Sequence, residues 1–183
     1  MEIGAGRSGY VRLMAHYNES MNAKLYAAAA GLSAEQLSAD RKAFFGSILG
    51  TLNHLVVADI LWLKRFAAHP AHHAALDPIR AQAAPTRLDQ PLAAGLQGLR
   101  VQRVALDRMI VDWAAALAEP DLDHALAYQN VQGVAARKNF FGLLMHFFNH
   151  QTHHRGQATT LLTQAGVDVG VTDLAPLIPN EDL

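Results

Sequence analysis

The sequence of 183 residues contains no cysteine. Disulfide bridges, thiolate nucleophiles and sulfur ligands for metals are therefore excluded, and any metal site must be built from nitrogen and oxygen atoms. An excess of charge of one sign is also lacking, because 15 lysine and arginine residues nearly balance 16 aspartate and glutamate residues. A nearly neutral chain with scattered charges offers no footprint for a nucleic-acid backbone or an anionic membrane, so we expect neither as a partner.

Long apolar runs are absent as well. No stretch has the length of a signal peptide's apolar segment or of a membrane span, so a cytoplasmic location is the default expectation. Apolar residues make up 51% of the chain and charged residues 17%, which is typical of a globular protein that buries its own core. We predict a single folded domain over residues 1–183.

Four long segments have apolar residues at helical spacing and are predicted to be helices. They are residues 9–30, 47–68, 92–118 and 139–164. The second segment is apolar nearly all the way round, which predicts a helix buried on most of its faces. Residues 69–91 contain several prolines and are predicted to form a long connection across the end of the helices.

The predicted fold is an all-α four-helix bundle. Ser33 is placed to cap one short helical turn after the first long helix. Polar and apolar residues alternate around Tyr128, and residues 130–133 carry a turn signal, so the sequence allows a small hairpin before the last helix. The tail that ends at Leu183 is expected to lie along the surface.

The stretch "HFFNHQTHHRGQ", residues 146–157, holds four of the ten histidines. His150 and His154 are four residues apart on the apolar stripe of the last helix, so we expect both imidazoles to face the interior. Two buried imidazoles one turn apart are hard to satisfy with side chains alone, whereas a divalent metal takes one nitrogen from each. A structural or solvated role for the pair is the alternative.

A third metal ligand is expected from a facing helix, because two ligands seldom make a tight site. His54 is the only histidine in the second long segment and is the best candidate. The alternative is a core histidine bonded to a backbone carbonyl or to Asn53. No carboxylate is clearly placed to act as a general base beside the metal. Asp59 is predicted to point away from His54, and Glu19 of the first helix is a candidate that no sequence pattern requires.

The sequence resembles the DinB family of DNA-damage-inducible, YfiT-like metalloenzymes over nearly the whole chain. The resemblance lies in "LNHLVVADILWLKRF", in "HFFNHQTHHRGQATTLLTQAG" and in "HYNESMN" of the first helix. It implies a four-helix bundle, often a homodimer, with a divalent metal held by three histidines. Nickel, zinc, iron and manganese are all compatible with such a family. Carried over position by position, the ligands are His54, His150 and His154.

Weaker candidates surround this set. Gln157 is expected to point toward the pair and to bond a ligand imidazole, or else to be a core amide paired with the backbone. Tyr17 and Asn18 either line the cavity beside the metal or pack the first helix. His146 and His153 either contact the ligand histidines or are solvated or bonded to backbone.

Two neighbours of the histidines are predicted to be structural. Gly156 is expected to allow a close helix approach, and Arg155 to pair with a carboxylate across an interface. The last helix also has a second apolar side, which packing against another helix or against a homodimer partner would each explain. That side consists of Phe141, Leu144, Phe148 and Leu162.

Three neutral nitrogen ligands leave an open position on a metal, which is the arrangement of catalytic sites. The resemblance extends to S-transferases that use low-molecular-weight thiols and to a thiol-dependent maleylpyruvate isomerase. A thiol-dependent transferase or isomerase acting on a small molecule is therefore the leading expectation, and metal-dependent hydrolysis is the next. The alternatives are a non-catalytic stress-response protein that binds a metal or ligand, and a metal-free structural dimer with His54 turned away.

Overall fold

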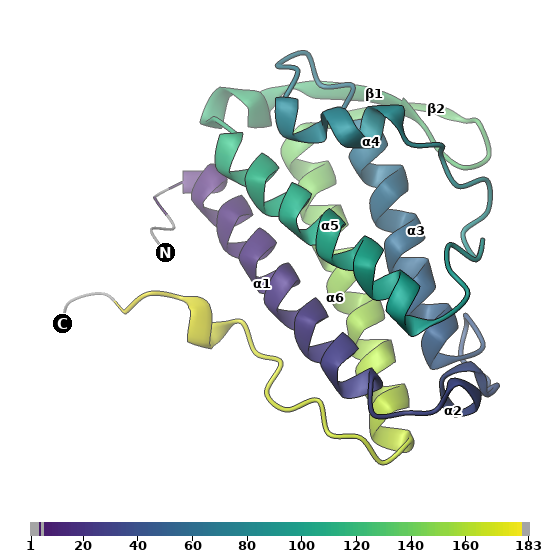
Figure 1. Cartoon of the computed structure of the whole chain (residues 1–183). Helices are drawn as coiled ribbons and strands as arrows, with labels where there is room; N and C mark the ends of the chain where they lie inside the picture. The colour runs from purple at the N-terminus through teal and green to yellow at the C-terminus, as the bar shows by residue number, and fades with distance from the viewer. Residues whose placement is uncertain (1–3, 5, 181–183) are drawn as a thin grey trace.

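The computed structural model describes residues 4 and 6–180 and is mostly helical. Four long helices lie alongside one another (Figure 1), and each of α1 and α3 packs against both α5 and α6. Each segment predicted to be a long helix is helical. These helices are α1 (Gly6–Ala29), α3 (Ile48–Phe66), α5 (Leu96–Ala116) and α6 (Phe140–Gln164), with two short ones, α2 (Ala34–Ser38) and α4 (Asp77–Ala81).

Side-chain caps determine where the two histidine-bearing helices begin. The Ser47 hydroxyl accepts a hydrogen bond from the Gly50 amide at 3.0 Å and caps α3. The Asn139 side chain accepts from the Gly142 amide at 2.9 Å and caps α6. Both caps satisfy a backbone donor that lacks a partner within the helix. Ser33 caps α2 in the same way, as predicted.

The helix α5 begins at Leu96, later than the predicted start at residue 92. The Leu92 amide donates instead to the side-chain oxygen of Asn53 on α3 at 2.9 Å, so a tertiary contact takes the place of a helical start. The connection predicted over residues 69–91 contains α4 and a turn of 3-10 helix at Ala74–Leu76.

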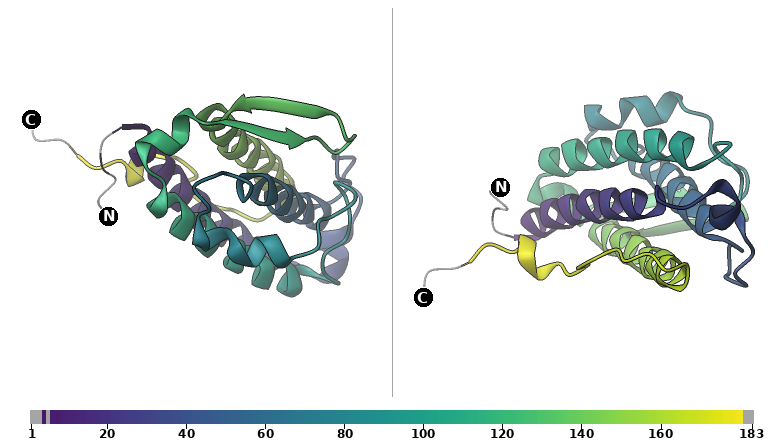
Figure 2. Two further views of the ribbon diagram at one scale, coloured as in Figure 1. Left: turned by 90° about the horizontal axis from the view of Figure 1, so that it is seen from above. Right: turned by 60° about the horizontal axis from the view of Figure 1, so that its bottom comes forward.

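A hairpin of β1 (Ala125–Gln129) and β2 (Ala135–Asn139) precedes α6, and the two strands are antiparallel. The Asn130 side chain accepts from the Val134 amide at 2.9 Å inside the turn, and Gly133 has a φ of 77° there, a conformation that favours glycine. The predicted hairpin is confirmed. It crosses the ends of the long helices (Figures 1 and 2).

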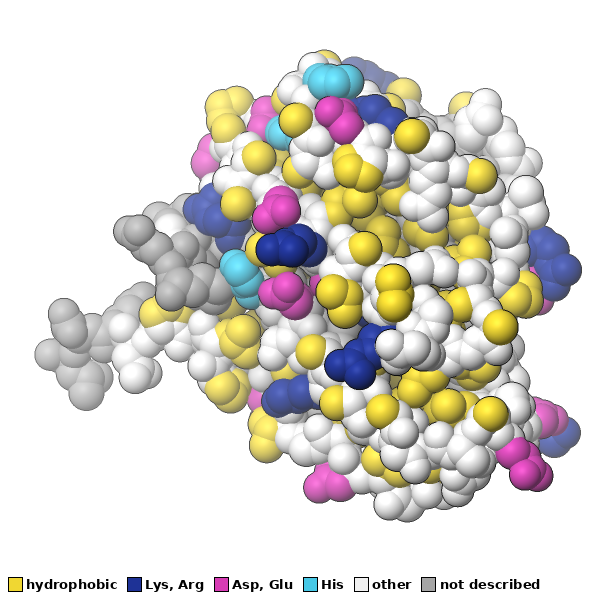
Figure 3. Space-filling model, viewed as in Figure 1, with side chains coloured by type: hydrophobic (Ala, Val, Ile, Leu, Met, Phe, Trp, Pro, Cys, Tyr) yellow, Lys and Arg dark blue, Asp and Glu magenta, His cyan; other side chains and the backbone are white. Residues whose placement is uncertain are grey.

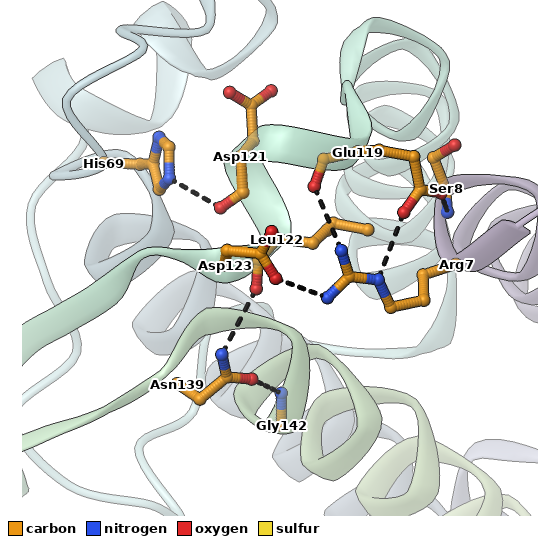
Figure 4. A network of polar contacts seen from close by, with 9 residues as sticks. All are labelled: Arg7, Ser8, His69, Glu119, Asp121, Leu122, Asp123, Asn139 and Gly142. Atoms are coloured by element: carbon orange, nitrogen blue, oxygen red, sulfur yellow. Dashed lines mark hydrogen bonds and ion pairs between the residues drawn. The ribbon is translucent and has the colours of Figure 1, made fainter.

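A polar network holds the beginnings of α1 and α6 to the segment that follows α5 (Figure 4). Arg7 donates to the carboxylates of Glu119 and Asp123 at 3.1 and 2.6 Å. The Asn139 amide donates to the Leu122 carbonyl oxygen at 3.3 Å. The cap of the histidine-bearing helix is thereby fixed to a second part of the chain.

The second apolar side of α6 is covered within the chain. Leu144, Phe148 and Leu162 are all buried, and α1 packs against α6. Phe141 is partly buried beneath the Arg7 guanidinium, which lies 5.7 Å from its ring centroid. Packing against a neighbouring helix therefore explains this surface, and it requires no second copy of the chain.

The tail after α6 lies along α1 (Figure 2), as predicted for its described part. The Tyr17 hydroxyl donates to the Thr172 carbonyl oxygen at 2.6 Å, and the Lys24 ammonium donates to the Val171 carbonyl oxygen at 2.7 Å. The predicted tail also includes residues 181–183, which lie outside the described residues.

Basic and acidic side chains are intermixed on the face shown in Figure 3. Over residues 4 and 6–180, no helix combines the length and apolarity needed to cross a membrane. The cytoplasmic location stays a prediction.

A buried ion network, which the sequence analysis did not predict, joins the four long helices. Asp59 on α3, Arg103 on α5 and Asp107 on α5 are each less than 5% exposed. Arg103 donates to the Asp59 carboxylate, and its other terminal nitrogen lies 3.0 Å from an Asp107 oxygen. The Gln151 amide on α6 donates to Asp59 at 2.8 Å, and the Asn22 amide on α1 donates to Asp107 at 2.8 Å.

Candidate metal centre

The packing of α3 against α6 brings His54 together with His150 and His154. One ring nitrogen of each histidine lies within 4.8 Å of the other two. The Nε2 atoms of His54 and His150 are 3.4 Å apart. Two nitrogens that each lie about 2.1 Å from one ion at a tetrahedral angle are about 3.4 Å apart. The pair therefore has the spacing that a shared ion requires.

The outer nitrogens of two of these imidazoles are already engaged. The Nδ1 atom of His54 lies 3.0 Å from the Leu88 carbonyl oxygen, which can only accept, so Nδ1 carries the hydrogen. The Nδ1 atom of His154 donates to the side-chain oxygen of Gln157 at 2.8 Å. In each ring the hydrogen on Nδ1 leaves the Nε2 lone pair free. Metal-binding histidines in proteins are held by such contacts.

Gln157 is oriented by a second contact. Its amide nitrogen lies 3.0 Å from Nε2 of His153 and donates to it, which leaves its oxygen for His154. Of the two predictions for Gln157, the structure thus shows contact with a histidine of the cluster rather than with the backbone. His153 is exposed and contacts the cluster both through this amide and directly, because its ring centroid lies 4.9 Å from that of His154.

Burial keeps the cluster uncharged. It lowers the pKa of His54 to about 4 and that of His150 to about 3, and it also lowers the pKa of His154. The three imidazoles are therefore neutral at physiological pH, and the neutral ring is the form that binds metals.

Phe45 also contacts the cluster, and sequence reasoning missed it. Its ring stacks on the His54 ring at a centroid distance of 3.8 Å and lies 5.6 Å from the His154 ring. Phe45 precedes the cap of α3 in a loop, where helical spacing gives no signal for its direction. It is half-buried and shields one face of His54.

A second group of potential ligands, His69, His73 and Asp121, also brings its donor atoms together. The hydrogen bonds of this second group differ from those of the cluster at His54, because both ring nitrogens of His69 are engaged. Nδ1 accepts from the Ala71 amide at 3.1 Å, so Nε2 carries the hydrogen and donates to the Asp121 carbonyl oxygen at 3.1 Å (Figure 4). His69 has no lone pair to offer, which favours the group at His54 as the metal site.

His146 lies beside the cluster without contributing an atom to it, and the two carboxylate candidates lie apart from it. The ring centroid of His146 is 6.0 Å from that of His150 and 5.0 Å from that of Trp62. Asp59 points into the ion network and away from His54, as predicted. Glu19 on α1 lies 3.8 Å from His16. Neither carboxylate contacts the three histidines.

Of the two roles predicted for Tyr17 and Asn18, the structure shows packing of the first helix rather than lining of a cavity beside the three histidines. Tyr17 binds the tail at Thr172, and the Asn18 amide donates to Asp107 at 3.1 Å while its oxygen accepts from Arg155. Both residues contact the face of α6 that carries Arg155. Consecutive residues of a helix point about 100° apart, so this face is turned from His154.

The predictions for Arg155 and Gly156 are also wrong. Arg155 is 5% exposed and donates to Asn18 and Thr152, so its partners are an amide and a hydroxyl inside the chain. A Cβ atom built on Gly156 meets no atom within 4 Å. Close helix packing does not explain that glycine.

One comparison with known proteins gave a match. The family model described as DinB family matches residues 6–180. The chain belongs to the DinB family. No curated protein and no solved structure gave a match. The family resemblance is thus confirmed over nearly the whole chain, and the three histidines that it implied are the three that the fold brings together.

The stability of this DinB protein without metal should fall as the pH falls from 7.5 to 5. In that range the unfolded chain binds protons at His54 and His150 that the folded chain excludes, because folding lowers both pKa values from 6.5. We expect a loss of roughly 1–2 kcal/mol for each histidine. Urea unfolding in the presence of chelator measures it.

The double variant His54→Gln, His150→Gln should lose the share of this pH dependence that these two histidines contribute. A variant of the partly exposed histidine on α1, His16→Gln, serves as the control and should retain it. An equal pH dependence in the double variant and the native chain would contradict the assignment.

Proposed function

We propose that this DinB protein binds a divalent metal ion through His54, His150 and His154 and is a metal-dependent enzyme acting on a small molecule. The observation that carries the proposal is the orientation of the imidazoles. Leu88 and Gln157 hold the Nδ1 hydrogens of two rings, so that the Nε2 lone pairs remain for a ligand. We also propose that the four long helices form the four-helix bundle that the family resemblance implies.

The three imidazoles are neutral, so they would hold a divalent ion without reducing its charge. A bound ion supplies Lewis-acid polarisation of a substrate oxygen or sulfur atom. Phe45 and Leu88 cover His54 and fix its ring, while Gln157 fixes the ring of His154. The three imidazoles suit nickel, zinc or iron, and the family resemblance adds manganese.

Thiol-dependent transfer or isomerisation is the chemistry that we propose, with a low-molecular-weight thiol as co-substrate. The family resemblance supports it. Neither Asp59 nor Glu19 contacts the cluster, so neither is placed to act as the general base of a hydrolysis. Pairing with a second copy of the chain is likewise a proposal that rests on the resemblance.

The metal content of the purified protein tests the site. The untagged chain, prepared without chelator, should contain close to one equivalent of metal by elemental mass spectrometry. His54→Ala, His150→Ala and His154→Ala should each lose it, because two imidazoles seldom retain an ion.

Two control variants accompany this experiment. His146→Ala alters the neighbouring turn of α6, and His69→Ala alters the second histidine group; both should keep the metal. If the native chain takes up none of nickel, zinc, iron and manganese offered in turn, the metal site and the enzyme proposal both fail.

A further inference from the structure

A hollow of about 340 Å³ opens between α3, α6 and the hairpin. It reaches from Asn139, the cap of α6, to His146 on that helix, whose ring lies one helical turn before His150. The hollow therefore adjoins the metal centre without containing any of its three histidines. Its volume suits a small organic molecule.

Aromatic rings form much of its wall. The ring centroids of Trp62 and Tyr128 are 5.6 Å apart, and the His146 ring lies 5.0 Å from that of Trp62. Gly142 leaves space on the facing turn of α6. Flat apolar groups pack well against such rings.

Two cations accompany these rings. The Arg65 guanidinium lies 4.5 Å from the Trp62 ring centroid and 5.3 Å from that of Tyr128. Lys138 lines the hollow from β2, and the strand register puts it on the same face of the hairpin as Tyr128. Burial lowers the pKa of His146, and the charges of Lys138 and Arg65 lower it further, so both cations are near this ring.

These cations have no anionic partner in the part of the chain that the structure describes. The ion pairs found there include neither Arg65 nor Lys138. The residues that line the hollow include no aspartate or glutamate. By contrast, the ammonium of the adjacent Lys64 is satisfied by backbone carbonyl oxygens, such as that of Ile79 at 2.8 Å. A partly buried guanidinium without a counter-ion is unfavourable, and an anionic ligand would compensate it.

We propose that this hollow binds an organic anion, a flat apolar body that carries a carboxylate or a phosphate group. The body would pack against Trp62 and Tyr128, with the anionic group beside Lys138. Arg65, which borders the adjoining hollow and lies over the same two rings, would attract the anion from the other side of them. That this anion is the substrate rests on the proposed function, because only then does the adjacent His150 belong to a reaction centre.

Isothermal titration calorimetry at low salt tests the binding site with three probes of one shape: phenylacetate, phenyl phosphate and the neutral phenylacetamide. We expect at least one anion to bind fivefold or more tightly than the amide. The order of phenylacetate and phenyl phosphate identifies the preferred head group. In the double variant Arg65→Gln, Lys138→Gln, the ratio of the Kd of the amide to the Kd of the anion should fall to near one.

The control is Arg137→Gln, which removes a cation from the opposite face of the same strand and should leave the preference unchanged. Circular dichroism establishes that each variant is folded. The proposal is overturned if the amide binds as tightly as both anions, if no probe binds at millimolar concentration, or if Arg137→Gln loses the preference to the same degree.

The His150→Ala variant separates this inference from the proposed function. It should lose metal yet keep the anion preference, because His150 does not line the hollow. A native chain that takes up no metal but prefers the anions retains the anion site and loses the enzyme proposal. A chain that binds metal and shows no preference loses the anion site alone.

Discussion

Replacement of Arg103 by methionine is expected to lower the free energy of unfolding by about 3–5 kcal/mol. Arg103 is 2% exposed and lies between two buried carboxylates, those of Asp59 and Asp107. Methionine keeps most of the side-chain volume but leaves both carboxylates without their cation. Urea unfolding at pH 7.5 measures the loss.

Arg108→Met is the matched control, because Arg108 is exposed on the same helix. Its effect should stay within about 0.5 kcal/mol. The double variant Asp59→Asn, Arg103→Met should lose less free energy of unfolding than the two single variants lose together, because the two residues contact each other. Additive losses would show that the two side chains act independently.

The network also matters for the metal centre. Gln151, which follows the cluster residue His150, donates to both oxygens of Asp59 at 2.8 Å. Asp59 lies on the same helix as His54. The network thus connects the two helices that supply the cluster. We infer that it aligns the three histidines as well as stabilising the fold.

Addition of zinc is expected to raise the free energy of unfolding by about 4 kcal/mol at a free concentration one thousand times the Kd. Only the folded chain brings His54 of α3 to the histidines of α6, so the ion binds the folded state in preference to the unfolded state. Chemical unfolding with zinc and with chelator measures the difference.

His150→Ala should remove this gain, whereas His146→Ala should retain it, since His146 contributes no atom to the cluster. A gain that persists in His54→Ala, His150→Ala and His154→Ala alike would place the zinc elsewhere. The group at His69 and His73 would then need to be tested next.

Local features of the sequence were enough to predict the helices and the histidine pair. Helical spacing depends on neighbours three or four residues away, so the four long segments and the shared side of His150 and His154 were predicted correctly. The caps and the hairpin turn are equally local, because they depend on Ser33 and Asn130 and on the few residues after each.

The sequence by itself thus determined the four long helices, the hairpin, the family and the three histidines. Only the tertiary structure decided what surrounds them. Tyr17 and Asn18 lie beside Arg155 because α1 packs against that face of α6. The loop that returns along α3 brings the Leu88 carbonyl oxygen to His54. Arg103 and Asp59 are 44 residues apart. Contacts of this kind depend on how whole helices pack, and the spacing of residues within one helix carries no information about them.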